Sequence, residues 1–344
     1  MNLRLSALQK HLSHDAALVE DPTDLLYLTG LTLSLGSLVV TKKEAVLFVD
    51  GRYFATAEKH APCPVKLSRE TDANALCKWL QDQHVHSLVF DSAFTSYHRF
   101  ELLKRELPDL QLIAKHSLLK AQRIIKDVHE IAALKKAQHL TIRGFQHVQG
   151  LLQEGVSEEE IAFEFEVFVR KQGASGLSFS PIVAFGDNTA YPHHRAGKTR
   201  LKKNQVVLID VGAIVDQYHG DLTRVVFFGE VDPTLHTWLR WTQAAQKKAL
   251  DAIKVGVPVK ELDMIARDAL AEHGVADKFT HGLGHGIGLE THEAPSLKAA
   301  GADRDTKLAA GMVITIEPGL YQPGLGGVRW EDMVLVLEHG YEKF

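Results

Sequence analysis

Residues 206–212 read Val-Val-Leu-Ile-Asp-Val-Gly, a strand-like apolar run that carries one acid, Asp210. Residues 313–319 read Val-Ile-Thr-Ile-Glu-Pro-Gly and carry Glu317 in the same way. An ionised carboxylate is costly to bury in such a run unless it is paired with a cation or bound to a metal ion. These two acids are therefore the first candidates for a functional site.

A second acid follows each of these runs. Asp221 begins the run that ends at Phe228, and Glu331 precedes the run Asp332–Leu337. If four carboxylates share a pocket, each pair about 4 Å apart is destabilised by roughly 4 kcal/mol at an effective dielectric constant of about 20. Two divalent ions with a bridging hydroxide would compensate most of this charge, so the four acids favour a dinuclear metal site. The alternative is that each acid pairs with a lysine or arginine at a strand end.

The segment 281–290 is the expected source of an imidazole ligand. It reads His-Gly-Leu-Gly-His-Gly-Ile-Gly-Leu-Glu, and its four glycines oppose a helix, so it is not the helical HExxH motif of zinc proteases. In an extended segment, one face carries His281, Leu283, His285 and Ile287, and glycines leave the other face bare. A bare face allows close approach of backbone, as beside a ligand or in a packed sheet. The alternative is a flexible histidine-rich loop.

A faint internal repeat runs through the C-terminal two thirds of the chain. Gly155-Val156-Ser157 opens a helix that ends at Gly173, and Gly256-Val257-Pro258 opens another that ends at Gly274. In each half the helix leads into a histidine-containing loop and then into strands that carry acids. The pattern predicts two ααββ-like units facing each other across a cleft, although so few identities also allow a chance similarity.

The sequence of the N-terminal third of the chain predicts a small α/β unit. Apolar runs predict strands over Leu25–Leu28, Ser37–Thr41, Ala45–Val49 and Ser87–Phe90. Helical spacing predicts helices over Asp72–His84 and Ser96–Leu107. A capping-box pattern at Asp127–Glu130 then opens a long amphipathic helix through about Gln153, which puts the domain boundary near Lys115–Lys126.

Composition narrows the class of protein. The 344 residues predict about two domains, and 45% hydrophobic with 24% charged residues is typical of a globular protein. A net charge of -4 argues against nucleic acid or an anionic membrane as a partner. With two cysteines and 19 histidines, any metal must be held by histidines and carboxylates. The N-terminal residues form no signal-peptide pattern, so we expect a soluble, cytoplasmic protein.

Five motifs in the C-terminal region occur in a fixed order. They are Ile209-Asp210-Val211-Gly212, His219-Gly220-Asp221-Leu222-Thr223-Arg224, His285-Gly286-Ile287-Gly288-Leu289-Glu290, Ile316-Glu317-Pro318-Gly319 and Gly327-Val328-Arg329-Trp330-Glu331-Asp332. Together they resemble the metal-site motifs of the metallopeptidases of the pita-bread fold, peptidase family M24. Asp21-Pro22, Tyr27-Leu28-Thr29-Gly30 and Asp50-Gly51-Arg52-Tyr53 resemble the N-terminal domain of its proline-peptidase branch, Xaa-Pro dipeptidase (prolidase) and Xaa-Pro aminopeptidase (aminopeptidase P).

The resemblance implies an α+β fold. Residues 123–344 would form a pita-bread (creatinase/aminopeptidase-like) catalytic domain with an internal pseudo-twofold repeat, and residues 1–122 a smaller creatinase-type α/β domain. The implied enzyme is a metallo-exopeptidase that hydrolyses the Xaa-Pro bond of dipeptides or at the N-terminus of peptides, by attack of a hydroxide that bridges two metal ions. A homodimer is also implied.

The resemblance further implies a role for each site residue. Asp210 would chelate one ion, His285 and Glu317 the other, and Asp221 and Glu331 both. Two divalent ions are expected, with Mn²⁺ favoured by the oxygen-rich ligand set, although Co²⁺ and Zn²⁺ bind most such sites more tightly.

The remaining residues would act on the substrate. Glu317 is the expected general base, His292 contacts the scissile carbonyl or the tetrahedral intermediate, and His193 lies beside the substrate. His281 is expected to line the same pocket. Arg329 is expected to lie against the metal cluster as a substrate-binding residue. The alternative is that Arg329 is a surface arginine. The competing functions are a methionine aminopeptidase and a metal-free binding module that has kept the fold.

Overall fold

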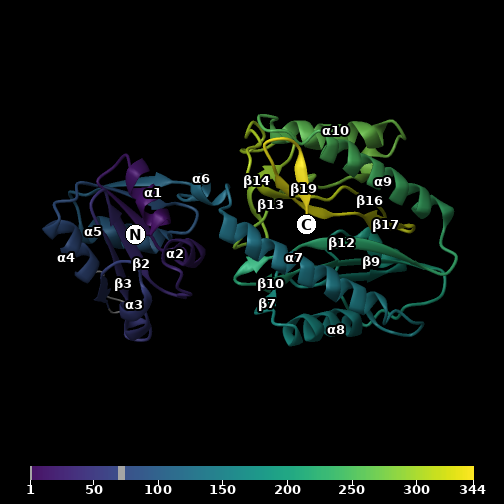
Figure 1. Cartoon of the computed structure of the whole chain (residues 1–344), viewed down its shortest axis with the longest axis horizontal. Coiled ribbons are helices and arrows are strands. Elements are labelled where there is room, and N and C mark those ends of the chain that lie inside the picture. Colours follow the sequence, from purple (N-terminus) through teal and green to yellow (C-terminus); the bar gives the residue numbers. More distant parts are fainter. Residues whose placement is uncertain (1, 69–73) are drawn as a thin grey trace. The chain divides into compact units, whose positions relative to one another are not determined.

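The computed structural model describes residues 2–68 and 74–344. The chain divides into two compact units, Met1–Arg123 and Ile124–Phe344, each with its own hydrophobic core (Figure 1). None of the helices in these described residues has the length and apolar character that crossing a lipid bilayer requires.

Unit 1 contains a mixed six-stranded sheet in the order β4-β3-β2-β1-β5-β6. The strands are β1 (Ala16–Val19), β2 (Ser37–Thr41), β3 (Ala45–Val49), β4 (Val65–Leu67), β5 (Ser87–Asp91) and β6 (Gln111–Lys115). The helices are α1 (Leu3–His11), α2 (Pro22–Thr29), α3 (Phe54–His60), α4 (Asn74–Asp82), α5 (Tyr97–Glu106) and α6 (Lys120–Arg123). The strands predicted at β2, β3 and β5 and the helix predicted at α5 are confirmed. The helix predicted over 72–84 is present as α4, and its predicted start at Asp72 lies outside the described residues.

The strand predicted over Leu25–Leu28 is wrong, because these residues lie in α2. The flanking residues explain the helix. The side chain of Asp21 accepts hydrogen bonds from the backbone N–H groups of Thr23 and Asp24, and Pro22 occupies the first turn. Gly30 ends the helix with a left-handed φ of 74°. The capping residues at both ends therefore determine a helix, although the short apolar run alone is also compatible with a strand.

Unit 2 consists of four long helices and several antiparallel sheets. The helices are α7 (Val128–Gln149), α8 (Glu158–Lys171), α9 (Pro233–Asp251) and α10 (Val259–Ala271), with short 3₁₀ turns η1 (Gly186–Ala190) and η2 (Ala276–Lys278). One sheet has the order β12-β9-β8, formed by Leu222–Phe228, Gln205–Val211 and Ile182–Phe185. Another has the order β14-β13-β15-β18-β19, formed by Glu293–Leu297, Gly284–Gly286, Val313–Ile316, Asp332–Val336 and Tyr341–Lys343.

Two smaller sheets complete unit 2. They have the orders β11-β10-β7 (Tyr218–His219, Ala213–Val215, Gly176–Leu177) and β16-β17 (Gly319–Gln322, Gly326–Arg329). In Figure 1, strands β9, β12, β16 and β17 lie between α9 and α10 on one side and α7 and α8 on the other. The predicted capping box of α7 is confirmed by reciprocal bonds between Asp127 and Glu130, and the helix ends at Gln149 rather than near Gln153.

The internal repeat is confirmed by matching backbone hydrogen bonds in the two halves of unit 2. Gly155 N–H donates to the carbonyl of Leu201, and Gly256 N–H donates equivalently to the carbonyl of Leu308, both at 2.8 Å. Isolated bridges also pair Ser157 with Arg200 and Pro258 with Lys307. In each half, the residues before a helix are thus tied to the segment that leads into β9, which contains Asp210, or into β15, which is followed by Glu317.

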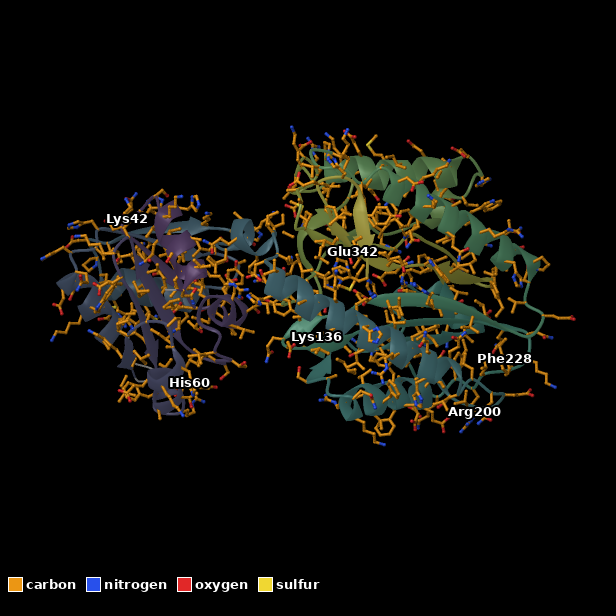
Figure 2. All side chains as sticks on the ribbon, viewed as in Figure 1. Lys42, His60, Lys136, Arg200, Phe228 and Glu342 are labelled. Atoms are coloured by element: carbon orange, nitrogen blue, oxygen red, sulfur yellow. The ribbon has the colours of Figure 1, made fainter. Side chains whose placement is uncertain are left out.

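The buried apolar clusters, rather than surface charges, stabilise this arrangement. Exposed pairs such as Lys135–Glu342 at 2.6 Å and Lys136–Asp216 at 2.8 Å join the surface of α7 to neighbouring segments, and Figure 2 labels Lys136 and Glu342 there. Pairs of this kind contribute at most about 1 kcal/mol each. Each half has its own apolar cluster, with Phe165 and Ile209 in one and Leu262 and Ile314 in the other.

One buried acid of unit 1 makes stability depend on pH. Asp24 pairs with Arg123 at 2.8 Å, yet burial raises the pKa of its carboxyl from 3.8 to about 6. The folded state therefore holds this proton more tightly than the unfolded chain does. The contribution of Asp24 to stability is fully present below about pH 3.8 and is lost as the pH rises through 6.

We expect Asp24→Asn to remove this dependence. The unfolding free energy of the wild type, minus that of Asp24→Asn, should fall by about 2 kcal/mol between pH 4 and 7. Urea unfolding of the full chain across this range measures the difference, and Asp82→Asn, at an exposed position in α4, is the matched control. A difference that stays constant with pH would show that burial does not shift the pKa of Asp24.

Candidate metal centre and active site

The four acids singled out from the sequence come from equivalent places in the two halves of unit 2. Asp210 lies in β9 and pairs in register with Thr223 of β12, and Asp221 immediately precedes β12. Glu317 follows β15, and Glu331 immediately precedes β18. Adjacent antiparallel strands of each half therefore bring one acid each to the same region. We call these four acids together with His285 the acid cluster.

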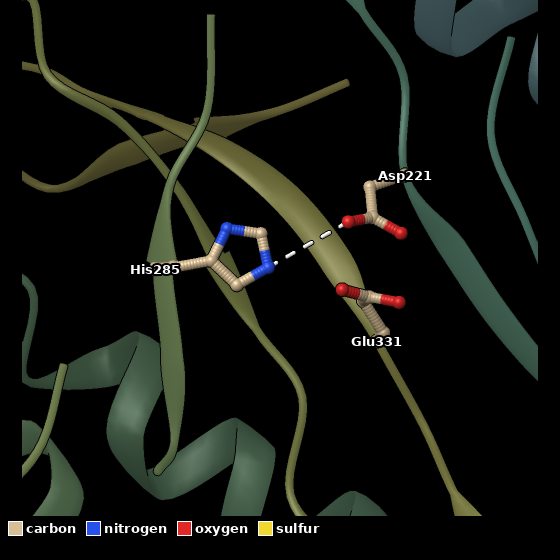
Figure 3. A group of neighbouring side chains, drawn as sticks. All are labelled: Asp221, His285 and Glu331. Carbon is tan, nitrogen blue, oxygen red and sulfur yellow. Dashed lines mark ion pairs between the residues drawn. The ribbon is translucent and has the colours of Figure 1, made fainter. Parts of the chain in front are cut away.

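Three members of the acid cluster converge closely. Asp221, His285 and Glu331 each present one ligand-type atom, and these atoms all lie within 4.8 Å of one another (Figure 3). Nε2 of His285 lies 3.6 Å from Asp221 Oδ2 and 3.4 Å from Glu317 Oε1. Burial is the main cause of the raised pKa values of Asp221, Glu317 and Glu331, and the charge of Asp210 raises all three further, so Asp210 belongs to the same group.

His285 is held in the form that binds metals. Its Nδ1 lies 3.0 Å from the carbonyl oxygen of Gly286, which can only accept, so Nδ1 carries the hydrogen. The lone pair of Nε2 then faces Asp221 and Glu317. Burial, together with the nearby His292, lowers the pKa of His285 to about 4, so the ring is neutral near pH 7.

The positive charge near the acid cluster is too small to compensate its carboxylates. Burial, followed by the charges of neighbouring acids, raises the pKa of Asp221 well above its usual range and raises that of Glu331 to about 8. Burial and Glu331 likewise raise the pKa of Glu317. Among the described residues, Oδ1 of Asp210 is buried and has no hydrogen-bond partner. An orphaned carboxylate oxygen among mutually repelling acids fits a site built for divalent cations.

Arg329 is the cation closest to these acids. It is 3% exposed, which excludes a surface arginine. Its guanidinium donates to Asp210 Oδ2, to the hydroxyl of Thr223 at 3.1 Å and to the hydroxyl of Tyr321 at 2.9 Å. One guanidinium cannot neutralise four carboxylates, and these bonds orient it toward Asp210. A contact between Arg329 and substrate stays a prediction.

The three other histidines named from the sequence lie around the acid cluster. His281 is bonded through Nε2 to Tyr321 at 2.9 Å, and burial lowers its pKa to about 3. The ring of His292 lies 4.3 Å from the ring of His285, measured between centroids. His193 is exposed, and its charge affects the pKa values of both His281 and His292. All three imidazoles therefore gather at one site.

Sequence patterns missed two residues that orient the acid cluster. Gln138 of α7 bonds both backbone groups of Asp221, accepting from N–H at 2.9 Å and donating to the carbonyl at 2.8 Å. Thr223 donates its hydroxyl to Glu331 Oε2 at 2.7 Å while accepting from Arg329. Thr223 lies within a quoted motif and could have been noticed, whereas Gln138 is far away in the sequence and carries no local signal.

The glycines of the segment 281–290 allow close packing of a sheet. A Cβ atom at Gly284 would lie 2.0 Å from the carbonyl oxygen of Thr315, and one at Gly286 would lie 2.1 Å from that of Ala294. Strand β13 pairs with both β14 and β15, so the backbone of His285 is held from two sides. The extended conformation is confirmed for Gly284–Gly286, whereas the rest of the segment 281–290 is irregular.

Comparison with known proteins identifies the family. The model of metallopeptidase family M24 matches residues 132–338, and that of the creatinase/prolidase N-terminal domain matches residues 3–125. The chain belongs to family M24. Its pita-bread domain follows a creatinase-type N-terminal domain, as the sequence motifs predicted.

This M24 chain is similar over almost its whole length to several proteins that are named as proline-specific peptidases. It is 33% identical to a Pyrococcus horikoshii protein named Xaa-Pro dipeptidase, covering 96% of this chain and 92% of the relative. A solved Xaa-Pro dipeptidase from Bacillus anthracis superimposes with a TM-score of 0.94 at 33% identity, covering 99% of this chain and 95% of the other. A Thermotoga maritima X-Pro aminopeptidase gives a TM-score of 0.90 at 31% identity, with coverages of 98% and 97%.

Because β13 packs closely against its neighbouring strands, one methyl group added to it should strongly destabilise the fold. Gly284→Ala should lower the unfolding free energy by more than about 2 kcal/mol, because its Cβ would collide with backbone rather than with a flexible side chain. Gly176→Ala in β7 is the matched control, since a Cβ there meets only ordinary contact at 3.5 Å. Denaturant unfolding compares the two, and equal effects would contradict the close approach of β13 and β15.

Proposed function

We propose that this chain is a metal-dependent exopeptidase that hydrolyses the bond between an N-terminal residue and proline, in dipeptides or in longer peptides. One observation carries the proposal: acids from the two halves of unit 2 lie around a neutral His285 in a family M24 fold, and the charge of Asp210 acts on all of them. The names of the relatives, Xaa-Pro dipeptidase and X-Pro aminopeptidase, supply the substrate class.

The acid cluster would hold two divalent ions. Asp210 would bind one ion, His285 and Glu317 the other, and Asp221 and Glu331 both, which gives the orphaned Oδ1 of Asp210 a partner. When bound, such ions act as Lewis acids and lower the pKa of water toward neutrality. Mn²⁺ suits a site of four carboxylates and one imidazole, with Co²⁺ and Zn²⁺ as the alternatives.

The surrounding residues would handle protons and developing charge. Glu317 would take a proton from the attacking water and return it to the prolyl nitrogen as the bond breaks. His292, exposed beside His285, would donate a hydrogen bond to the carbonyl oxygen as negative charge develops there. His193 would contact the substrate near the leaving prolyl group, and the neutral His281 would line the pocket with Tyr321 behind it.

A methionine aminopeptidase is the second candidate, because it would need the same five ligands. The match of residues 3–125 to the creatinase/prolidase N-terminal domain favours the proline branch instead. Both dipeptidases and an aminopeptidase are among the similar proteins, so the length of the preferred substrate is part of the proposal's test. We also expect a homodimer.

Substrate assays separate these functions. With Mn²⁺, Co²⁺ or Zn²⁺ supplied, Xaa-Pro dipeptides and Xaa-Pro-Yaa peptides should be hydrolysed and Met-Gly-Yaa peptides should not. Cleavage of the dipeptides alone would indicate a prolidase. Cleavage of Met-Gly-Yaa peptides in preference would support the methionine aminopeptidase, and no hydrolysis of any peptide would indicate a binding module.

Replacing His292 tests the role of a group outside the metal ligands. We expect His292→Ala to lower kcat for an Xaa-Pro substrate by about 100-fold, because a donor to the developing oxyanion is lost. Metal content, measured by elemental analysis, should stay at the wild-type value. His339→Ala, in an exposed turn of the same unit, is the control. A His292→Ala enzyme with kcat near the wild-type value would remove His292 from the mechanism.

A further inference from the structure

A buried carboxylate outside the acid cluster organises the loop that carries His193. Glu158, the first residue of α8, is 0% exposed. Its Oε1 accepts from the N–H of Phe185 at 2.9 Å and from the side-chain amide of Asn188 at 2.8 Å. Its Oε2 lies 2.9 Å from Nε2 of His194 and accepts from the N–H of Gly197 at 3.2 Å.

These bonds enclose the segment 185–197, which we call the His193 loop. Phe185 ends β8, Asn188 lies in η1, and Gly197 closes the loop before it returns to β9. One carboxylate thus binds the beginning, the middle and the end of the loop. His194 is held inward against Glu158, and its neighbour His193 is left exposed.

The hydrogen bonds around Glu158 depend on its carboxylate group. Among the described residues, His194 is the only ion-pair partner of Glu158, so no lysine or arginine compensates its burial. A buried carboxylate is tolerated in this situation only when donors satisfy its oxygens, and each of the two oxygens here accepts from two donors. An ionised carboxylate only accepts, so Nε2 of His194 carries a hydrogen.

We propose that Glu158 is a positioning residue for the proposed reaction, because it fixes the His193 loop so that His193 faces the acid cluster. The proposal rests on the proposed function, in which His193 contacts the substrate. None of the hydrogen bonds of Glu158 in the described part of the chain reaches a member of the acid cluster. The effect of Glu158 on catalysis should therefore pass entirely through the loop.

Glu158→Gln tests this role with little change in volume. The amide group can accept at one oxygen only, so it must lose the backbone N–H donor on one side, either Phe185 or Gly197. The side chains of Asn188 and His194 can each also act as acceptors, so they can pair again with the new NH2 group. Hydrogen exchange at the amides of Phe185 or Gly197 should accelerate. The value of kcat/KM for an Xaa-Pro substrate should fall by about 10-fold or more, since small displacements of positioning groups have effects of this size. Bound metal should be unchanged.

Glu159→Gln is the matched control, because Glu159 is the next residue of the same helical turn, carries the same charge and is exposed. It should keep kcat/KM within about twofold of the wild-type value. Glu158→Asp serves as a second variant that restores both acceptor oxygens. It should recover part of the activity lost in Glu158→Gln.

A double-mutant cycle with His193→Ala distinguishes positioning from general damage. If Glu158 acts through His193, Glu158→Gln should lower kcat/KM by less than about twofold in the His193→Ala background. A full additional loss there would overturn the positioning role while leaving the proposed function intact. If His193→Ala alone leaves kcat/KM unchanged, both the proposed role of His193 and the positioning by Glu158 are wrong.

Discussion

Mutual repulsion among the buried carboxylates is the constraint on which the site depends. Burial and neighbouring charges raise the pKa values of Asp221, Glu317 and Glu331. Arg329 pairs with Asp210, and Arg224 contacts the backbone of Glu331, so these two guanidinium groups leave part of the negative charge uncompensated. Such a group would be strongly destabilising if it were only structural, since apolar residues fill the same strands around it. The arrangement is stable in its ionised form only with additional positive charge, which the proposed divalent ions would supply.

The two-fold construction of unit 2 explains how the chain assembles this group. Each half has its own apolar cluster and its own pair of acids, so neither half alone concentrates four charges. Tertiary contacts then refine the geometry: Gln138 fixes the backbone of Asp221, Thr223 orients Glu331 and Arg329, and Glu158 holds the loop of His193. The acids would bind metal, and these supporting residues determine how accurately the surrounding groups face it.

Sequence alone predicted what depends on local pattern. An acid within an apolar run is visible at Asp210 and Glu317, and alternating glycines are visible around His285. The strand predicted at Leu25–Leu28 was wrong because capping by Asp21 and Gly30 decided the conformation. Contacts between distant residues, such as Gln138 with Asp221 and Glu158 with the His193 loop, leave no local pattern and required the folded structure.

The most direct test of the central claim is the number of divalent ions that the acid cluster binds. Titration of metal-free protein with Mn²⁺, followed by calorimetry and elemental analysis, should give two ions per chain and a rise in Tm on binding. Asp210→Asn should weaken one of the two sites, because it removes the acid with the orphaned Oδ1. A wild-type protein that binds fewer than two ions at saturating Mn²⁺, Co²⁺ and Zn²⁺ would contradict the assignment of the four carboxylates to a dinuclear site.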